Sequence, residues 1–314
     1  VRWRGTVGPG VCGEVASAVV GAAIVRTVSL SSPLRRIIPA LLSFLLLVAA
    51  YPVVVGPAQA RSHSVESASP DLTFPLAVGH REVLVSLPEH HDPSVARPVI
   101  LTFGGWHETP EQMAATTGLR EASDAIVVYA RGVENAWAGA PYSATSPEED
   151  LAFARDAVRE VAARHPVDWS RVYAVGHSNG GAFALLLACR APDLVAGVVS
   201  VAGMFYDPVD AACVGDPVPV QVIHAEDDPV AQVSGGLRHD AHFLSAREML
   251  DRWADRNGCL SVPFSRAGAV PGVTAHEWWG CHAETRSLLS DGGGHGWPPH
   301  AAWEAWDFLS RQNR

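Results

Sequence analysis

The stretch RVYAVGHSNGGAFALLLA, residues 171–188, passes from a β-branched apolar segment into one rich in alanine and leucine. The first segment predicts a buried strand and the second a helix, and the two meet at Ser178 within the pentapeptide GHSNG. A glycine-rich connection whose serine merely caps a helix would look the same in isolation. The flanking strand and helix favour the other interpretation, G-x-S-x-G, in which a tight turn exposes a nucleophilic hydroxyl above the strand ends.

Short apolar runs recur along the chain, with helical patterns between them. The later runs are apolar on both faces, which is typical of a buried parallel sheet, whereas the first is expected to be an antiparallel edge strand. The runs cover residues 81–88, 98–105, 125–130, 171–176, 196–203 and 219–225, and helices are expected over 146–165, 179–191, 241–256 and 300–311. This alternation predicts an α/β fold with a mostly parallel central sheet covered by helices on both faces. Together with the G-x-S-x-G turn it resembles the α/β-hydrolase fold. The connections are too short for a large lid domain.

Helix capping supports the expected helix at 146–165. Ser146 is placed to be its N-cap, Pro147 lies at N1, and Glu149 lies at N3, where its side chain can complete a capping box.

A serine hydroxyl needs a base to take its proton, and the base needs a carboxylate to orient it. In this fold the acid follows the serine and the histidine comes last. The apolar run 219–225 ends in the acidic sequence EDD, and Asp228, held by the following proline, is the expected acid. Asp227 and Asp207 are the alternatives.

The expected base is His295, in the glycine-rich loop LLSDGGGHGWPPH, residues 288–300, with His300 and His282 as alternatives. His177 is expected to pack behind the turn, and His224, at a strand end, to be a hydrogen-bonded structural histidine.

Two histidine-containing groups, EHHD at 89–92 and HDAH at 239–242, could be interpreted as metal ligands. Both are expected to lie in solvated surface loops, so no metal site is predicted.

Stabilising the oxyanion of an acyl-transfer reaction needs two backbone donors. One is expected from Asn179 and the other from Gly105 or Trp106, in the loop LTFGGWHE after an early central strand. Trp106, Trp137 and Trp297 are expected to bind the substrate.

The N-terminal 60 residues resemble an export leader. Arg35 and Arg36 precede an uncharged apolar run over 37–55, and Ala58-Gln59-Ala60 is a small-residue cleavage site. A membrane-spanning anchor is the alternative, since the run has 19 residues. We expect cleavage after Ala60, a secreted protein without a stable membrane anchor, and a single catalytic domain over 61–314. Residues 1–29 exceed a usual n-region, so translation is expected to begin near Val28.

Charge and composition narrow the function. Of 314 residues, 48% are hydrophobic, enough for one large core. Removing residues 1–60 takes away five arginines and Glu14, leaving 18 basic and 32 acidic side chains and a formal charge of −14. Nucleic acid is therefore not an expected partner. The chain has no lysine, which excludes lysine-based catalysis.

Four cysteines follow the leader: Cys189, Cys213, Cys259 and Cys281. An even number in an exported protein predicts two disulfides, for which three pairings exist. Bonds between neighbours in the sequence, Cys189 with Cys213 and Cys259 with Cys281, are preferred.

Taken together, these motifs resemble the secreted esterases of the poly(3-hydroxybutyrate) depolymerase family, which includes feruloyl and acetylxylan esterases. The resemblance covers roughly residues 75–310 and rests on the segment 171–203, on EEDLAFARDAVREVAARHPVD before it, and on VIHAEDDPV, DRWADRNGC and GGGHGWP. It implies Ser178 as nucleophile, Asp228 as carboxylate and His295 as base, and Cys259 with Cys281 resembles the family's late disulfide. The chain departs from the family at Gly104-Gly105, where a His-Gly pair is usual.

The resemblance implies hydrolysis of polyester or plant-polysaccharide-linked esters through an acyl-enzyme. No metal or organic cofactor is needed, and a monomer is expected. A cell-envelope acyltransferase with the same triad, or an inactive secreted binding protein, are the alternative functions.

Overall fold

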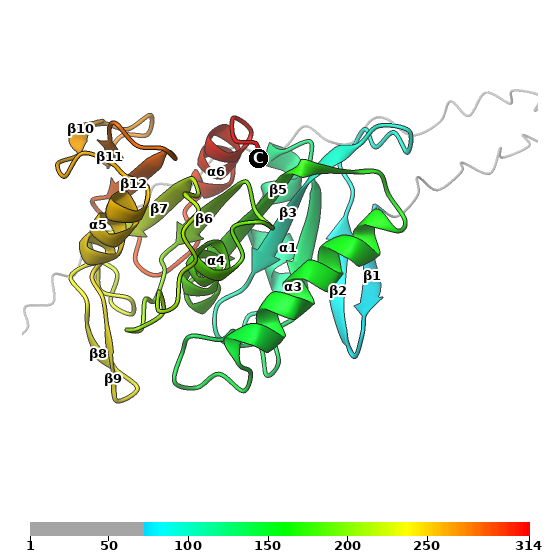
Figure 1. The fold of residues 1–314 in the computed structure, drawn as a ribbon, viewed down its shortest axis with the longest axis horizontal. Coiled ribbons are helices and arrows are strands. Elements are labelled where there is room, and N and C mark those ends of the chain that lie inside the picture. The colour runs from blue at the N-terminus through cyan, green and yellow to red at the C-terminus, as the bar shows by residue number, and fades with distance from the viewer. Residues whose placement is uncertain (1–71) are drawn as a thin grey trace, which may run out of the picture. The chain divides into compact units, whose positions relative to one another are not determined.

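The computed structural model describes residues 72–314, in which ten strands form one sheet. The expected leader, its cleavage site and the start near Val28 lie outside these residues. The strand order is β1-β2-β4-β3-β5-β6-β7-β12-β11-β10 (Figure 1). The six strands from β4 to β12 run parallel, and antiparallel strands extend the sheet at both ends. The expected mostly parallel sheet is confirmed.

The strands of this sheet are β1 (Thr73–Val78), β2 (Arg81–Ser86), β3 (Arg97–Phe103), β4 (Ile126–Ala130), β5 (Val167–His177), β6 (Gly197–Val201), β7 (Val220–Ala225), β10 (Phe264–Ala267), β11 (Val273–Trp278) and β12 (Thr285–Ser290). A separate hairpin consists of β8 (Gly236–Arg238) and β9 (Ala241–Phe243). The prediction that 81–88 is an edge strand is wrong, because β2 pairs with both β1 and β4.

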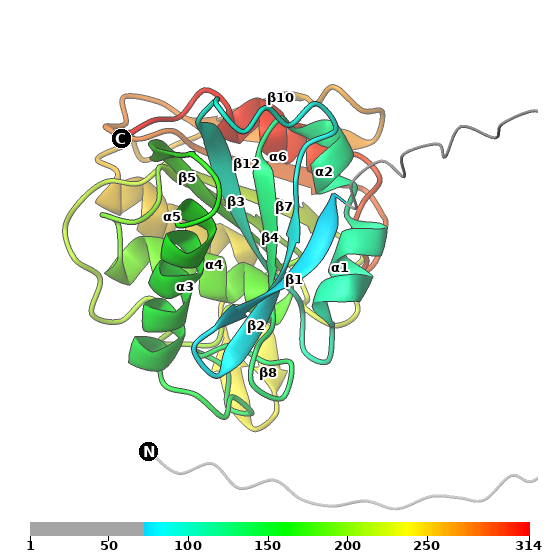
Figure 2. The same ribbon diagram turned by 90° about the vertical axis from the view of Figure 1, so that its right-hand side faces the viewer.

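Helices cover both faces of the sheet (Figure 2). One face is covered by α3 (Pro147–Ala162), α4 (Asn179–Arg190) and α5 (Ala246–Arg256), and the other by α1 (Pro110–Thr116), α2 (Leu119–Ala122) and α6 (Ala301–Leu309). The capping box predicted at Ser146 forms with Glu149. The helix expected over 241–256 begins later, because residues 241–243 form β9 and Ser245 caps α5.

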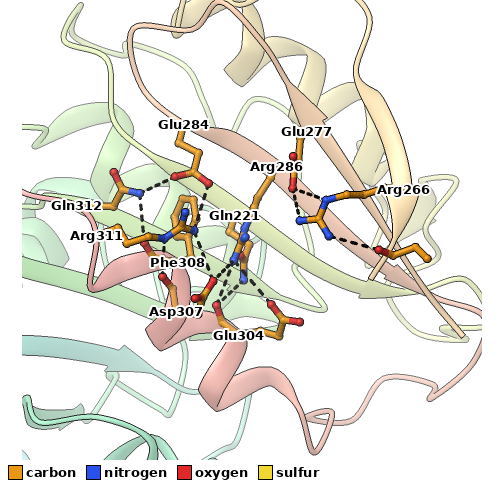
Figure 3. A network of polar contacts seen from close by, with 11 residues as sticks. Gln221, Arg266, Glu277, Glu284, Arg286, Glu304, Asp307, Phe308, Arg311 and Gln312 are labelled. Atoms are coloured by element: carbon orange, nitrogen blue, oxygen red, sulfur yellow. Dashed lines mark hydrogen bonds and ion pairs between the residues drawn. The ribbon is translucent and has the colours of Figure 1, made fainter. Parts of the chain in front are cut away.

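A buried polar network ties α6 to the sheet (Figure 3). Arg286 of β12 donates through Nε to Gln221 Oε1 of β7. Its Nη2 lies 3.5 Å from Asp307 Oδ2 and 3.8 Å from Glu304 Oε2, both on α6. The loop between β12 and α6 is therefore anchored at both of its ends.

Both disulfides pair cysteines that are neighbours in the sequence, Cys189 with Cys213 and Cys259 with Cys281. These are the preferred pairings. The first fastens the end of α4 to the segment after β6, and the second joins the end of α5 to the β11–β12 turn. Among residues 72–314, no helix is long and apolar enough to cross a membrane.

Candidate active site

Ser178 lies in a sharp turn between β5 and α4, with φ of 53° and ψ of −115°. The turn is possible because its neighbours lack side chains. A Cβ at Gly176 would lie 2.0 Å from the Gly180 carbonyl oxygen, and a Cβ at Gly180 would lie 2.0 Å from the Phe103 carbonyl oxygen. The backbone of Ser178 is itself held, since its N–H donates to Val201 O (2.9 Å). The geometry is that of a nucleophile elbow.

A continuous chain of hydrogen bonds links Ser178, His295 and Asp228. His295 Nε2 is 2.8 Å from Ser178 Oγ, and His295 Nδ1 is 2.8 Å from Asp228 Oδ2. The Asp228 side chain is fully buried, and its other oxygen accepts the backbone N–H groups of Val230 (2.8 Å) and Ala231 (2.9 Å). The three side chains that the sequence singles out, from three separate loops, therefore meet at the carboxyl edge of the sheet.

The protonation states suit a base and its carboxylate. Burial opposes ionisation of Asp228, but hydrogen bonds from two histidines and the Val230 amide hold its pKa well below the usual range. Burial lowers the pKa of His295 below its ordinary value, and the interaction with Asp228 only partly opposes this. An ionised Asp228 beside a neutral His295 can accept a proton from the Ser178 hydroxyl.

The alternative residues have other places in the structure. Asp227 Oδ1 accepts the Gly294 N–H (2.8 Å) and so braces the histidine loop, and Asp207 pairs with Arg252 (3.3 Å) on α5. His224 Nε2 donates to Ala231 O (2.7 Å), which fits the structural role expected of it. The His300 side chain makes no capping hydrogen bond at the start of α6, and the His282 ring lies against Gly258.

His177 does more than pack behind the turn. Its Nδ1 is 2.9 Å from Glu108 Oε2, and its Nε2 is 2.9 Å from the backbone oxygen of His295. Both partners only accept hydrogen bonds, so both ring nitrogens donate and the imidazole is a cation. Burial works against this charge, but the bond to Glu108 raises the pKa of His177 above its ordinary value. An ion pair between the buried His177 and the half-buried Glu108 thus holds the backbone of His295.

The same carboxylate changes the expected oxyanion hole. The Gly105 N–H donates to Glu108 Oε2 at 2.5 Å, so the expectation that Gly105 is an open donor is corrected. The Trp106 N–H, next in the loop, has no hydrogen-bond partner within residues 72–314, and the Asn179 N–H is the first of the α4 N-terminus. Asn179 and Trp106 are left as the two candidate donors.

The three tryptophans have different places. Trp106 is 40% exposed and lines a pocket of about 220 Å³ that contains Ser178 and His295. The expectation that Trp137 binds the substrate is wrong, because this residue is buried in the core. Its indole Nε1 donates to Gly104 O (3.1 Å), and its backbone N–H donates to Asn179 Oδ1 (2.7 Å). Trp297 lines a separate hollow beside Trp303, so its expected role in this pocket is also corrected.

Four further residues line this pocket, and none of them was predicted from the sequence to do so: Tyr142, Tyr206, Arg238 and His239. His239 belongs to the HDAH group, which was expected to lie in a solvated loop, and it is exposed in the β8–β9 turn as expected. Its ring also contacts Trp106 edge-on (5.3 Å between centroids). No local pattern reveals that these residues line the pocket, since they come from separate segments of the chain that only the fold brings together. Among residues 72–314, no group of three or more His, Cys, Asp or Glu side chains is placed to hold a metal ion.

Known proteins are similar to this chain over much of its length. A family model described as "Putative esterase" matches residues 78–267, a range that includes Ser178 and Asp228 and ends before His295. The chain is 31% identical to "Putative esterase NocK" of Nocardia uniformis subsp. tsuyamanensis, over 64% of this chain and 66% of that protein. It is 25% identical to feruloyl esterase B of Piromyces equi, over 74% of this chain and 45% of that protein. It thus spans less than two thirds of either relative.

A solved structure shares the fold. The acetyl xylan esterase from Aspergillus awamori superposes with a TM-score of 0.61 at 14% identity, covering 76% of this chain and 98% of that one.

Proposed function

Because this chain belongs to the esterase family whose model it matches, and has the α/β-hydrolase fold, we propose that it is a serine carboxylic-ester hydrolase acting through Ser178, His295 and Asp228. The observation that carries the proposal is the pair of 2.8 Å hydrogen bonds that joins the three side chains at the wall of a pocket. Two disulfides and the leader sequence support a secreted enzyme.

The proposed reaction transfers an acyl group in two steps. Ser178 Oγ attacks the ester carbonyl carbon while His295 Nε2 takes the hydroxyl proton, and His295 then gives that proton to the departing alcohol oxygen. The N–H groups of Asn179 and Trp106 hold the oxyanion, helped by the positive end of α4. Water, activated by His295, then releases the acid from Ser178.

The pocket favours an aromatic or otherwise planar ester. Trp106 stacks on Tyr142 with 4.2 Å between ring centroids, so an aromatic surface lines the same pocket as Ser178. Feruloyl esterases among the relatives support an aromatic acid as the acyl group, and esters linked to plant polysaccharide as the substrate class. Polyester remains the other class implied by the sequence.

A covalent trap tests the nucleophile. A fluorophosphonate ester should add one phosphonyl group to Ser178 and abolish hydrolysis of 4-nitrophenyl acetate, because only an activated serine attacks phosphorus at neutral pH. Peptide mass spectrometry locates the adduct, and a pre-steady-state burst of 4-nitrophenol measures the acyl-enzyme. Labelling at another serine with activity intact would reject the proposal.

The ion pair behind the elbow gives a second prediction. Glu108→Gln removes the charge that keeps His177 protonated and loosens its bond to the His295 backbone, so we expect kcat to fall about tenfold with little change in KM. Steady-state kinetics on 4-nitrophenyl acetate measures both constants. Glu111→Gln, an exposed change in the neighbouring helix α1, is the matched control. An unchanged kcat together with a lower unfolding midpoint would make Glu108 purely structural.

A further inference from the structure

Arg238 is a cation without a partner. Of the 17 arginines in residues 72–314, it alone has a side chain with neither a hydrogen bond nor an ion pair. The guanidinium stays unpaired although acidic residues outnumber arginines in this chain, 33 to 23. The unpaired guanidinium lines the same pocket as Ser178 and His295.

Arg238 lies at the base of a tight hairpin turn. It ends β8, and the two residues of the β8–β9 turn, His239 and Asp240, have φ of 51° and 56°. Both residue types belong to the few besides glycine that adopt this left-handed conformation readily. The hairpin projects from the body of the domain in Figure 1.

The hairpin is fastened to the elbow through the segment after β6. Met204 donates its N–H to Ser178 O (3.1 Å), and two residues later the Tyr206 hydroxyl is 2.6 Å from His239 Nδ1. The Asp207 N–H donates to His242 O (3.0 Å) on β9. The backbone of the hairpin that carries Arg238 is therefore tied to the elbow, while the exposed guanidinium itself makes no hydrogen bond.

The surroundings of Arg238 in the pocket are aromatic. Tyr142, Tyr206, His239 and Trp106 form one contacting cluster, which we call the aromatic wall. Burial raises the pKa of Tyr142 and of Tyr206. The positive charge of Arg238 acts in the opposite direction and lowers both pKa values, because the guanidinium lies near the two hydroxyls. The pocket's one carboxylate, Glu108, is neutralised by His177. An anionic group entering the pocket thus meets a free cation beside an apolar surface.

We infer that Arg238 binds a carboxylate carried by the substrate, so that the enzyme prefers esters in which a planar group bears a negative charge. This inference rests on the proposed esterase function. A guanidinium and a carboxylate pair through two parallel hydrogen bonds, which also fixes the orientation of a flat substrate against the aromatic wall.

The test compares esters that differ only in charge. Monomethyl terephthalate and methyl 4-carbamoylbenzoate place the carboxylate or its neutral amide on the acyl side. The pair 4-carboxyphenyl acetate and 4-carbamoylphenyl acetate places them on the alcohol side. We define the charge preference as kcat/KM for the anionic ester divided by kcat/KM for the neutral one. Comparing this ratio between wild type and variant cancels the intrinsic reactivity of each ester.

For Arg238→Gln, the charge preference should fall about tenfold on one of the two sides, and that side identifies where the substrate carries its carboxylate. Arg238→Lys should keep part of the preference, and Arg238→Glu should lower it further. The control Arg247→Gln makes the same charge change on α5, where the native arginine pairs with Asp251 (2.8 Å) outside the pocket. Hydrolysis of 4-nitrophenyl acetate by the control Arg247→Gln should stay near wild type, because Arg247 lies outside the pocket.

Two outcomes overturn the inference. One is an equal charge preference in wild type and Arg238→Gln on both sides, and the other is an equal loss in Arg247→Gln, which would indicate a long-range charge effect. Failure of the proposed function is distinct: Ser178→Ala would then hydrolyse these esters as fast as wild type.

Discussion

Replacing Ser178 by alanine should lower kcat for 4-nitrophenyl acetate by about 10⁶-fold, because loss of a triad nucleophile leaves only the oxyanion donors and binding. The side chain of Ser178 bonds to His295 alone, so its loss exposes no other buried polar group. Alanine tolerates the φ of 53° no worse than serine, and the unfolding free energy should change by less than about 1 kcal/mol. Steady-state kinetics and urea unfolding measure the two effects.

The matched control for this variant is Ser170→Ala. Ser170 lies on strand β5, near the opposite end from the elbow, and its hydroxyl donates a hydrogen bond only to Asp168 (2.6 Å). Its activity should equal that of wild type. Comparable activity in Ser178→Ala and Ser170→Ala would end the serine-esterase proposal and leave a binding protein or a different nucleophile.

Replacing Asp228 by asparagine should lower kcat by about 10⁴-fold while the fold survives. Asparagine can donate to His295 Nδ1 instead of accepting from it, which turns the imidazole into the wrong tautomer for accepting the serine proton. The variant keeps an oxygen for the Val230 and Ala231 N–H groups, so the loop after β7 should stay ordered. The measurement is kcat/KM across pH 4–9.

The pKa shifts of His295 and Asp228 predict how activity depends on pH. A base must be neutral to act, so wild-type kcat/KM should fall as the pH drops through the pKa of His295, which burial lowers from its ordinary value. Asp228 stays ionised throughout this range, because its pKa lies well below the usual range, and so contributes no second step.

Asp227→Asn separates the two neighbouring acids. Asp227 accepts only the Gly294 N–H, and asparagine keeps an oxygen for that bond. Its kcat should change by less than about tenfold. A larger loss in Asp227→Asn than in Asp228→Asn would exchange their proposed roles and contradict the hydrogen bonds of the structure.

The Glu108–His177 pair sets this site apart from a bare triad. The cation formed by His177 sits directly behind the elbow, with 5.3 Å between its ring and that of His295, and donates to the backbone of the same residue. Glu108 at the same time occupies the Gly105 amide in the loop where Gly104-Gly105 replaces the His-Gly pair of the resembling family. With the Gly105 N–H occupied, the N–H groups of Asn179 and Trp106 are the two candidate donors for the proposed oxyanion hole.

The elbow and the sheet could be predicted because their signals are local. The close backbone contacts at Gly176 and Gly180 require glycine, so the G-x-S-x-G pattern predicts the sharp turn. A strand that is apolar on both faces is stable only when both faces are covered, here by two layers of helices. The order of serine, acid and histidine then pointed to Asp228 and His295. Where the local signal was weak, prediction failed: β1 contains Pro75, β10 is fully exposed, and neither resembles a buried strand.

The pocket could not be predicted in the same way. Trp106, Tyr142 and Tyr206 come from three loops and Arg238 from the end of β8, and nothing near each of them in the chain indicates which others it will meet. Trp137 also lies in a loop, yet it is buried, and Gly104 and Asn179 supply its hydrogen-bond partners. The turn that exposes Ser178 depends on short-range backbone geometry that a few residues encode. The meeting of Ser178 with Asp228 and His295, and the pocket beside them, depend on long-range packing, which exists only once the chain has folded.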